Sequence, residues 1–316
     1  MARVVVSSVL AVDLGPLLPA GTAVIAPGRG SYSRAELLAT LAEADALICL
    51  LTDRVDSELL AHAPRLRVVA NHAVGVDNID LEACARRGVM VANTPDVLTD
   101  ATADLTFALL LAAARRLGEG ERLVRSGAWR GWEPTQLLGV PVSGQTLGLV
   151  GLGRIGAAVA RRARGFDMPL CYAAPRPVEG AHELGARHVP LDELLAGSDF
   201  VSLHGPLTPE TRGLIGAREL ARMKSTAVLI NTARGACVDE DALADALTAG
   251  RLFAAGLDVF AAEPALSPRL VACDRAVLLP HLGSATHRAR ARMAELCAAA
   301  VTDVLAGRSP THRVGP

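Results

Sequence analysis

The sequence has few aromatic residues and no excess of charge of one sign. Phe, Trp and Tyr make up only 3% of the 316 residues, while 51% of the chain is hydrophobic, so Ala, Leu and Val must fill most of the core. The formal net charge at pH 7 is -1, which does not suggest a basic surface for nucleic acid or membrane lipid. We therefore expect no nucleic-acid partner and no membrane partner.

Long apolar runs and a secretory leader are also missing. The longest apolar helical stretch, residues 105–114, is bounded by Asp104 and Arg115. It is too short to cross a bilayer, which takes about 20 residues. The N-terminus enters a strand-like run at residues 4–6 without the apolar segment and cleavage site of a signal peptide. These features predict a cytoplasmic protein.

The cysteines lack the spacing of a metal site and the density of a disulfide scaffold. No two of them stand in a CxxC pair. We interpret them as reduced thiols of an intracellular protein and predict no metal. They are Cys49, Cys84, Cys171, Cys237, Cys273 and Cys297.

Short runs of Val, Ile and Leu alternate with helical segments along the whole chain. Nearly continuous apolar strands between helices predict parallel sheets covered on both faces. The predicted strands of the first block are residues 3–7, 22–26, 46–51, 66–71 and 89–93. Those of the second block are residues 147–150, 169–172, 200–203, 227–231, 254–259 and 276–279. We predict an α/β fold of two Rossmann-like or flavodoxin-like doubly wound domains with a cleft between them.

Two long helices, at residues 99–117 and 285–305, are expected to connect the blocks, so that the first domain is discontinuous. We predict a substrate (catalytic) domain formed by residues 1–98 and 287–316. Residues 99–286 would form the dinucleotide-binding Rossmann domain, because six strands suit such a sheet.

A Gly-x-Gly-x-x-Gly motif lies between the strand at 147–150 and a helix. In this pattern Gly151 permits a tight turn, Gly153 lets the backbone approach a pyrophosphate, and Gly156 lets the helix pack close to the strand. The helix N-terminus then offers free N–H groups to the phosphates. The motif alone is weak evidence, and a glycine-rich turn without a ligand is the alternative.

The residues after the next strand bear on the choice of dinucleotide. An NAD site usually has an acidic residue about 20 positions after the glycines. Here no acid stands between Asp167 and Glu179, and Arg176 is well placed for a 2′-phosphate. The sequence therefore favours NADP(H) over NAD(H), although Arg176 as an ordinary surface cation remains the alternative reading.

Arg234, Glu263 and His281 follow three successive predicted strands and form the candidate catalytic group. A guanidinium can hold the carboxylate of a 2-keto acid through two parallel hydrogen bonds. A His is suited to give a proton to the carbonyl oxygen, and a carboxylate on its other nitrogen fixes the tautomer. Each residue alone is more often a surface or structural residue, so the interpretation depends on all three occurring together.

With these motifs the chain resembles the D-isomer-specific 2-hydroxyacid dehydrogenases over nearly its whole length. Residues 231–235, 280–286, 204–208 and 239–243 match that family in order and spacing. Residues 93–104 and 129–134 resemble the glyoxylate/hydroxypyruvate and 2-ketogluconate reductases within it. The resemblance implies an NAD(P)H-dependent reduction of a small 2-keto acid to the D-2-hydroxy acid.

The resemblance also implies roles for individual residues. Arg234, Glu263 and His281 would be catalytic, and the N–H groups of Val74 and Gly75 would hold the substrate carboxylate. The other substrate-binding candidates are Leu51, Arg234 itself and Ser284. The cofactor-binding candidates are Thr102, Gly151, Gly153, Arg154, Ile155, Gly156, Arg176, His204, Pro206, Thr211, Thr232, Ala233, Arg234, Asp258, His281 and Gly283.

These relatives are typically homodimers that prefer NADPH, and the segment around Trp132 often lies near the partner's active site. His72 departs from the family, in which Tyr is common at that place, and so changes the polarity expected of the pocket. Residues 71–77 lack the Lys of phosphite dehydrogenases, and Glu263 stands where formate dehydrogenases carry Gln. A dinucleotide-sensing co-repressor-like module remains the alternative, since it would keep the same catalytic residues.

Overall fold

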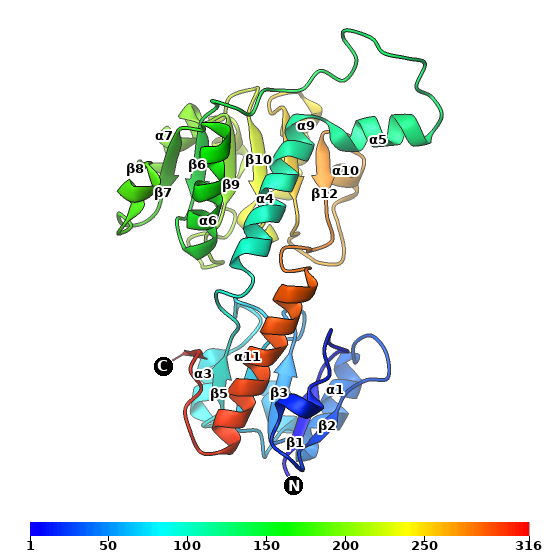
Figure 1. Cartoon of the computed structure of the whole chain (residues 1–316), viewed down its shortest axis with the longest axis vertical. Helices are drawn as coiled ribbons and strands as arrows, with labels where there is room; N and C mark the ends of the chain where they lie inside the picture. Colours follow the sequence, from blue (N-terminus) through cyan, green and yellow to red (C-terminus); the bar gives the residue numbers. More distant parts are fainter. Residues whose placement is uncertain (316) are drawn as a thin grey trace. The chain divides into compact units, whose positions relative to one another are not determined.

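The computed structural model describes residues 1–315, which divide into two compact units. The first unit comprises residues 1–98 and 285–316 of the chain, and the second comprises residues 99–284 (Figure 1). Each unit has a mainly parallel sheet between layers of helices, so the predicted α/β class is confirmed.

The sheet of the first unit has six strands in the order β13-β5-β4-β3-β1-β2. Its strands are β1 (Arg3–Val6), β2 (Ala23–Ile25), β3 (Ala46–Cys49), β4 (Val68–Asn71), β5 (Met90–Ala92) and the antiparallel β13 (Arg313–Val314). Its helices are α1 (Arg34–Thr40), α2 (Ser57–His62), α3 (Leu81–Arg86) and α11 (His287–Leu305), with 3-10 turns at Gly15–Leu17 and Leu41–Glu43.

Alternate residues of these strands enter two different cores. Val5 and Leu47 pack with the helix residues Leu37 and Leu59 on one face. On the other face Val4, Ile48 and their neighbours pack against α11. Both faces of the sheet are therefore buried, which explains the nearly continuous apolar strands in the sequence.

The sheet of the second unit has seven strands in the order β12-β11-β10-β9-β6-β7-β8, all parallel. Its strands are β6 (Leu147–Val150), β7 (Leu170–Ala173), β8 (Ala186–His188), β9 (Phe200–Leu203), β10 (Val228–Asn231), β11 (Ala254–Leu257) and β12 (Ala276–Leu278). Its helices are α4 (Thr99–Ala114), α5 (Leu117–Arg125), α6 (Arg154–Ala163), α7 (Leu191–Gly197), α8 (Ala217–Leu220), α9 (Glu240–Thr248) and α10 (Pro268–Val271), with 3-10 turns at Arg164–Phe166, Ala181–Leu184 and Gly235–Cys237.

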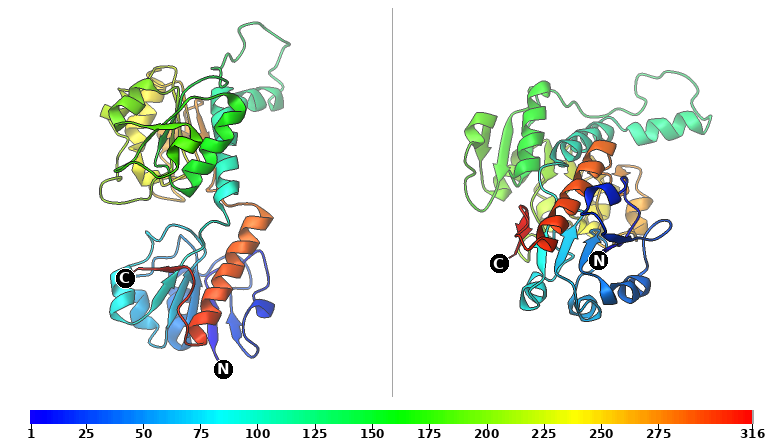
Figure 2. Two further views of the ribbon diagram at one scale, coloured as in Figure 1. Left: turned by 60° about the vertical axis from the view of Figure 1, so that its left-hand side comes forward. Right: turned by 60° about the horizontal axis from the view of Figure 1, so that its bottom comes forward.

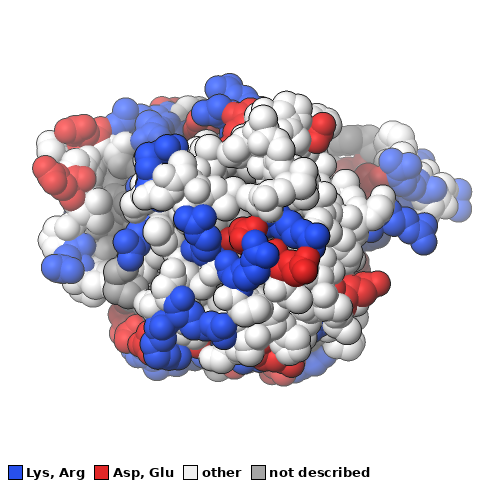
Figure 3. All heavy atoms as spheres, turned by 90° about the horizontal axis from the view of Figure 1, so that it is seen from below, with Lys and Arg blue, Asp and Glu red and all other residues white. Residues whose placement is uncertain are grey.

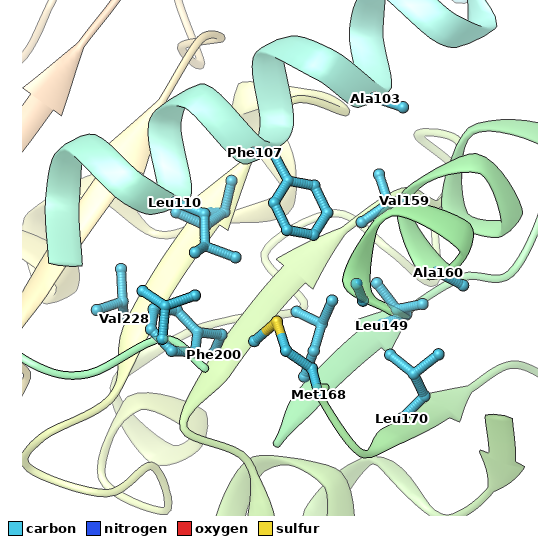
Figure 4. Packing of buried hydrophobic residues seen from close by; sticks show 14 of the residues in the cluster. Ala103, Phe107, Leu110, Leu149, Val159, Ala160, Met168, Leu170, Phe200 and Val228 are labelled. Carbon is cyan, nitrogen blue, oxygen red and sulfur yellow. The ribbon is translucent and has the colours of Figure 1, made fainter. Parts of the chain in front are cut away.

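One face of this sheet is covered by α4 and α6. Phe107 of α4 stacks on Phe166 with ring centroids 5.4 Å apart, and the same cluster takes in Val159 and Phe200 (Figure 4). The opposite face packs against α7, α8 and α9 through residues such as Leu194 and Leu243. Aliphatic and Ala side chains make up most of both cores, as the low aromatic content predicted.

The prediction of one helix over residues 99–117 is wrong, because α4 ends at Ala114. The carbonyl of Ala114 accepts the N–H of Val140, and Arg116 turns to φ +54°, in the left-handed region. The Arg116 guanidinium is held there by two hydrogen bonds to the Glu119 carboxylate, 2.8 and 2.6 Å long. A separate helix, α5, begins at Leu117 and was not predicted.

The six strands predicted for the second block omitted β8. This strand has three residues at the sheet edge, and Arg187 and His188 are exposed, so it has no apolar run. The short edge strand β13 was omitted for the same reason. Neither omission changes the fold class.

The segment of α5 and the loop after it stands away from the sheet of its own unit in both further views (Figure 2). The face drawn in Figure 3 carries basic and acidic side chains interspersed. No helix among residues 1–315 is long and apolar enough to span a bilayer.

Candidate active site

The glycine motif joins β6 to α6 in a turn with little free space. Gly151 has φ +93°, and a Cβ there would lie 2.8 Å from the Gly205 nitrogen. A Cβ on Gly156 would lie 2.5 Å from the Gly151 oxygen. A Cβ on Gly153, in contrast, would meet no protein atom within 4 Å. The turn is therefore packed on its inner side and open at Gly153, where no side chain caps the helix N-terminus, and this suits a phosphate group.

Beside this turn lies a cavity of about 780 Å³ that belongs entirely to the second unit. Among its lining residues are Gly151, Ala174, Pro175, Pro206 and Thr211. A cavity of this volume lies within the range of small-molecule sites. The residues present therefore fit a dinucleotide, with the glycine turn at the phosphates and the cavity next to it.

The loop after β9 is held by its own hydroxyl groups. Thr211 Oγ1 donates to the Pro206 carbonyl at 2.7 Å and accepts the Thr208 N–H at 2.7 Å. His204 instead pairs its Nε2 with Ser202 Oγ at 2.9 Å, and burial lowers the pKa of His204 to about 4. Pro206 and Thr211 line the cavity, whereas His204 is not among its lining residues and pairs with Ser202 instead.

Three other predicted cofactor residues do not line the cavity themselves. Arg154 is exposed in the first turn of α6, and Ile155 packs against the core that α4 covers. Arg176 is exposed in the loop after β7, next to the cavity residue Pro175.

His281 and Glu263 lie in direct contact. His281 Nδ1 is 2.8 Å from Glu263 Oε2, and Glu263 Oε1 accepts the Phe260 N–H at 2.9 Å. An ionised carboxylate can only accept, so Nδ1 carries the hydrogen and Nε2 is the other ring nitrogen. Both side chains are about one quarter exposed. The pair is therefore an imidazole oriented by a carboxylate.

Electrostatics keep Glu263 ionised. Burial alone would raise its pKa, but the hydrogen bonds from His281 and the Phe260 N–H, with the charges of His281 and Arg234, outweigh burial and lower the pKa of Glu263. A carboxylate that stays charged can stabilise a protonated imidazole beside it. Glu263 is therefore suited to support His281 as a proton donor.

Arg234 is placed by a loop that touches the Glu263 loop. The Asn231 side chain donates to the Arg234 carbonyl at 2.8 Å and accepts the Ala233 N–H at 3.0 Å. A Cβ on Gly235 would lie 1.9 Å from the Phe260 carbonyl carbon, so only glycine fits between the two backbones. The loops after β10 and β11 are thereby fixed against each other.

Asp258 fixes the backbone of the His281 loop through three hydrogen bonds. Its carboxylate accepts the N–H groups of Leu282 at 2.6 Å and Gly283 at 2.8 Å, and its carbonyl accepts the His281 N–H at 2.9 Å. Burial raises the pKa of Asp258, and these hydrogen bonds offset only part of that effect. His281 itself has φ +56°, which is uncommon for a residue other than glycine. The Asp258 contacts hold it in this conformation.

Buried hydroxyl groups connect α4 to two of these loops. Thr102 Oγ1 donates to the Gly283 carbonyl at 3.0 Å, and Thr106 Oγ1 lies 2.9 Å from Thr232 Oγ1. Thr106 also donates to the Thr102 carbonyl at 2.8 Å. The predicted cofactor residues Thr102 and Thr232 are thus buried in this network, and sequence reasoning did not single out Thr106.

The candidate carboxylate loop, residues 71–77, begins at the end of β4 in the first unit. The Asn93 side chain donates to the Val74 carbonyl at 2.8 Å, and the Asn71 side chain donates to the Gly75 carbonyl at 2.7 Å. Within residues 1–315, no hydrogen bond joins the Val74 or Gly75 N–H to another protein group. The carbonyls of Val74 and Gly75 are held, while their N–H groups stay available to a ligand. The two asparagines at the strand ends are the sequence feature that could have indicated this arrangement.

The remaining candidates of the substrate pocket differ in burial. Leu51 is half-buried in the turn after β3, and Ser284 is half-buried in the segment before α11. His72 is only 3% exposed; its Nε2 lies 3.3 Å from the Arg290 carbonyl, and its buried Nδ1 has no partner within residues 1–315. Its polarity is therefore directed into the first unit rather than exposed at its surface.

Comparison with known proteins agrees with this chemistry. Residues 107–283 match the family model described as D-isomer specific 2-hydroxyacid dehydrogenase, NAD binding domain. The chain is 52% identical over 286 residues to a glyoxylate reductase of Thermococcus litoralis, covering 89% of this chain and 86% of that protein.

Solved structures extend the similarity to nearly the whole chain. A protein of Thermus thermophilus is 48% identical and superimposes with a TM-score of 0.92, covering 99% of both chains. An NADPH-dependent glyoxylate/hydroxypyruvate reductase of Sinorhizobium meliloti, in complex with NADP and malonate, is 32% identical with a TM-score of 0.87, covering 99% of this chain and 96% of that one. The chain therefore belongs to the D-isomer-specific 2-hydroxyacid dehydrogenases, the family of NAD(P)-dependent oxidoreductases that its sequence resembles.

Proposed function

We propose that this enzyme reduces glyoxylate, hydroxypyruvate or a similar small 2-keto acid to the D-2-hydroxy acid and uses NADPH in preference to NADH. The observation that carries the proposal is the His281–Glu263 pair, 2.8 Å apart, within the electrostatic reach of Arg234. The glyoxylate reductase names of the relatives agree with it.

His281 acts as the general acid. Its Nδ1–H group keeps donating a hydrogen bond to Glu263, so the proton that goes to the substrate oxygen comes from Nε2. Glu263 stabilises the imidazolium before transfer and keeps the ring in one tautomer afterwards. The bound dinucleotide supplies the hydride that reaches the carbonyl carbon.

Two groups are assigned to the substrate carboxylate. The Arg234 guanidinium offers a planar pair of donors that matches a carboxylate. In the first unit the N–H groups of Val74 and Gly75 are the second candidate, because Asn93 and Asn71 already hold their carbonyls. Leu51 and Ser284 are assigned to the pocket around the substrate.

NADPH preference is assigned to the loop after β7. No acidic side chain stands at the end of this strand, and Arg176 is exposed beside the cavity residue Pro175. A guanidinium there would attract a 2′-phosphate, whereas an acid would repel it.

We also propose a homodimer built on the α5 segment. Several of the exposed large hydrophobic side chains of the described chain lie between residues 117 and 138. They are Leu117, Val124, Trp129, Trp132 and Leu138. Exposed apolar area of this kind is typical of a protein interface, and Trp132, 81% exposed, is its most prominent member.

The test is the initial rate of NADPH and NADH oxidation with glyoxylate, hydroxypyruvate and 2-ketogluconate. We expect turnover with at least one of them and a higher kcat/KM with NADPH. Binding of dinucleotide without turnover of any of the three would refute the proposal. It would favour a module that senses dinucleotide and regulates a partner.

A further inference from the structure

The loop formed by residues 174–178 follows β7 and carries Arg176. Its first residues, Ala174 and Pro175, line the cavity beside the glycine turn, and so does His188 on the edge strand β8. The path of this short loop therefore determines where the Arg176 backbone stands at the rim. Figure 1 shows β7 and β8 side by side at one edge of the sheet.

Both ends of this loop are bonded to one pair of rings. His188 Nε2 is 3.0 Å from the Ala174 carbonyl, and Tyr172 Oη accepts the Val178 N–H at 2.9 Å. A carbonyl can only accept, so His188 Nε2 must carry a hydrogen. The two rings contact each other, with centroids 5.0 Å apart and planes tilted by 35°.

The loop has little means of fixing itself. Pro175 and Pro177 have no N–H group, so only three of its five residues could donate a backbone hydrogen bond. The two prolines restrict φ, but the rotation of the loop about its ends depends on contacts at those ends. Tyr172 is 2% exposed and is held by the core, which gives the loop a rigid anchor.

We propose that the Tyr172–His188 ring pair is a positioning element that fixes loop 174–178 at the cavity rim and thereby sets the selectivity for a ribose 2′-phosphate. Tyr172 is buried in the core and His188 lines the cavity, and neither is assigned a part in the reaction itself. The inference rests on the proposed role of Arg176. A ring pair that only strengthens the sheet edge would change stability and leave selectivity unaltered.

The experiment measures the dissociation constants of NADPH and NADH by calorimetry in three variants. His188→Phe keeps a ring and removes the donor, His188→Gln keeps an N–H donor without the ring, and Tyr172→Phe keeps the ring and removes the acceptor. His182→Phe is the matched control, since it places the same change on an exposed histidine of the Ala181–Leu184 turn.

We expect His188→Phe and Tyr172→Phe each to weaken NADPH binding about three- to tenfold, the range for one lost hydrogen bond, with NADH binding changed less than about twofold. His188→Gln should recover most of the NADPH affinity. With glyoxylate, the KM for NADPH should rise while kcat stays close to that of the parent enzyme. The control should alter neither dissociation constant.

The variant Arg176→Ala distinguishes the role of Arg176 from that of the ring pair. Loss of NADPH selectivity in Arg176→Ala but not in His188→Phe would overturn the ring-pair proposal and keep the role of Arg176. Unchanged selectivity in both variants would refute the role of Arg176 and the ring-pair proposal with it. An equal loss of NADPH and NADH binding in His188→Phe would also overturn the inference, since it would show a general structural effect.

Discussion

The two units share an architecture and differ in what their strand ends present. After β4, the first unit offers the backbone N–H groups of Val74 and Gly75. The carbonyl groups of these two residues are held by asparagine side-chain amides. After β10, β11 and β12, the second unit offers a guanidinium, a carboxylate and an imidazole. Binding can thus be supplied by a shaped backbone, whereas proton transfer needs side chains with suitable pKa values.

Two histidines, one in each unit, also differ in their surroundings. His281 shares a hydrogen bond with Glu263, while His72 is buried next to the carbonyl of Arg290 with an unpartnered Nδ1. Burial lowers the pKa of His72 to about 4. One histidine is therefore equipped to carry a proton and the other to remain neutral.

The largest effect is expected from removing His281, the proposed proton donor. In His281→Asn, kcat should fall at least about a hundredfold, which is typical of losing a general acid. Binding of NADPH, measured by calorimetry, should stay near that of the parent because the glycine turn is untouched. Steady-state rates with glyoxylate test this, and a kcat close to the parent value would remove His281 from the mechanism.

The buried His72 should affect the pH dependence of the free energy of unfolding and not the reaction rate. The folded-state pKa of His72 is about 4, below the ordinary 6.5, so the unfolded chain takes up a proton first as the pH falls. The contribution is therefore intact above pH 6.5 and is lost toward pH 4. At pH 5 the loss already amounts to about 2 kcal/mol.

Urea unfolding at pH 7.5 and pH 5 measures this dependence. In His72→Leu the change between the two pH values should shrink, whereas the exposed His62→Gln should leave it as in the parent. An identical pH dependence in His72→Leu and the parent would mean that His72 does not control acid stability.

Arg234→Lys should have an intermediate effect on binding. A lysine keeps the charge but loses the planar pair of donors, so KM for glyoxylate should rise about tenfold. The KM for NADPH should change little. If KM for glyoxylate is unaltered in the lysine variant, another group binds the carboxylate.

The network between α4 and the catalytic loops should contribute about 1 kcal/mol at a single hydroxyl. Thr106→Val removes the partner of the buried Thr232 hydroxyl, 2.9 Å away, and leaves that group unsatisfied. Thr106→Ser keeps the hydroxyl and is the control. Chemical unfolding should show the loss in the valine variant alone, and equal stability of the two would mean that the contact contributes nothing.

Sequence patterns predicted much of this fold because apolar strands and glycine turns are local signals. A Cβ at Gly151 or Gly156 would collide with the backbone, so the turn requires glycine at both positions. This requirement makes the motif recognisable from the sequence alone. The break at Arg116 was not visible, because it depends on Val140 taking the Ala114 carbonyl from 26 residues away. The edge strand β8 was missed because pairing with β7, and not an apolar run, makes it a strand.

In the candidate site, too, local features could be predicted from the sequence and long-range contacts could not. Arg234, Glu263 and His281 could be proposed from their residue types at strand ends, since each type implies a chemistry. The asparagines of the first unit carry no such implication, and their role depends on which carbonyl each amide reaches. The Thr106–Thr232 contact and the Tyr172–His188 ring pair likewise join residues that only the fold brings together.

The smallest effect is expected from an asparagine that shapes the backbone. Asn93→Ala frees the Val74 carbonyl, so the adjacent N–H groups lose part of their fixed orientation. KM for glyoxylate should rise about threefold, the lower part of the range for one hydrogen bond, while kcat and the KM for NADPH stay constant. A matching change in Asn71→Ala would show that both amides act on this loop, because Asn71 holds the neighbouring Gly75 carbonyl. If neither variant alters KM for glyoxylate, loop 71–77 takes no part in substrate binding, and the second unit alone must hold the carboxylate.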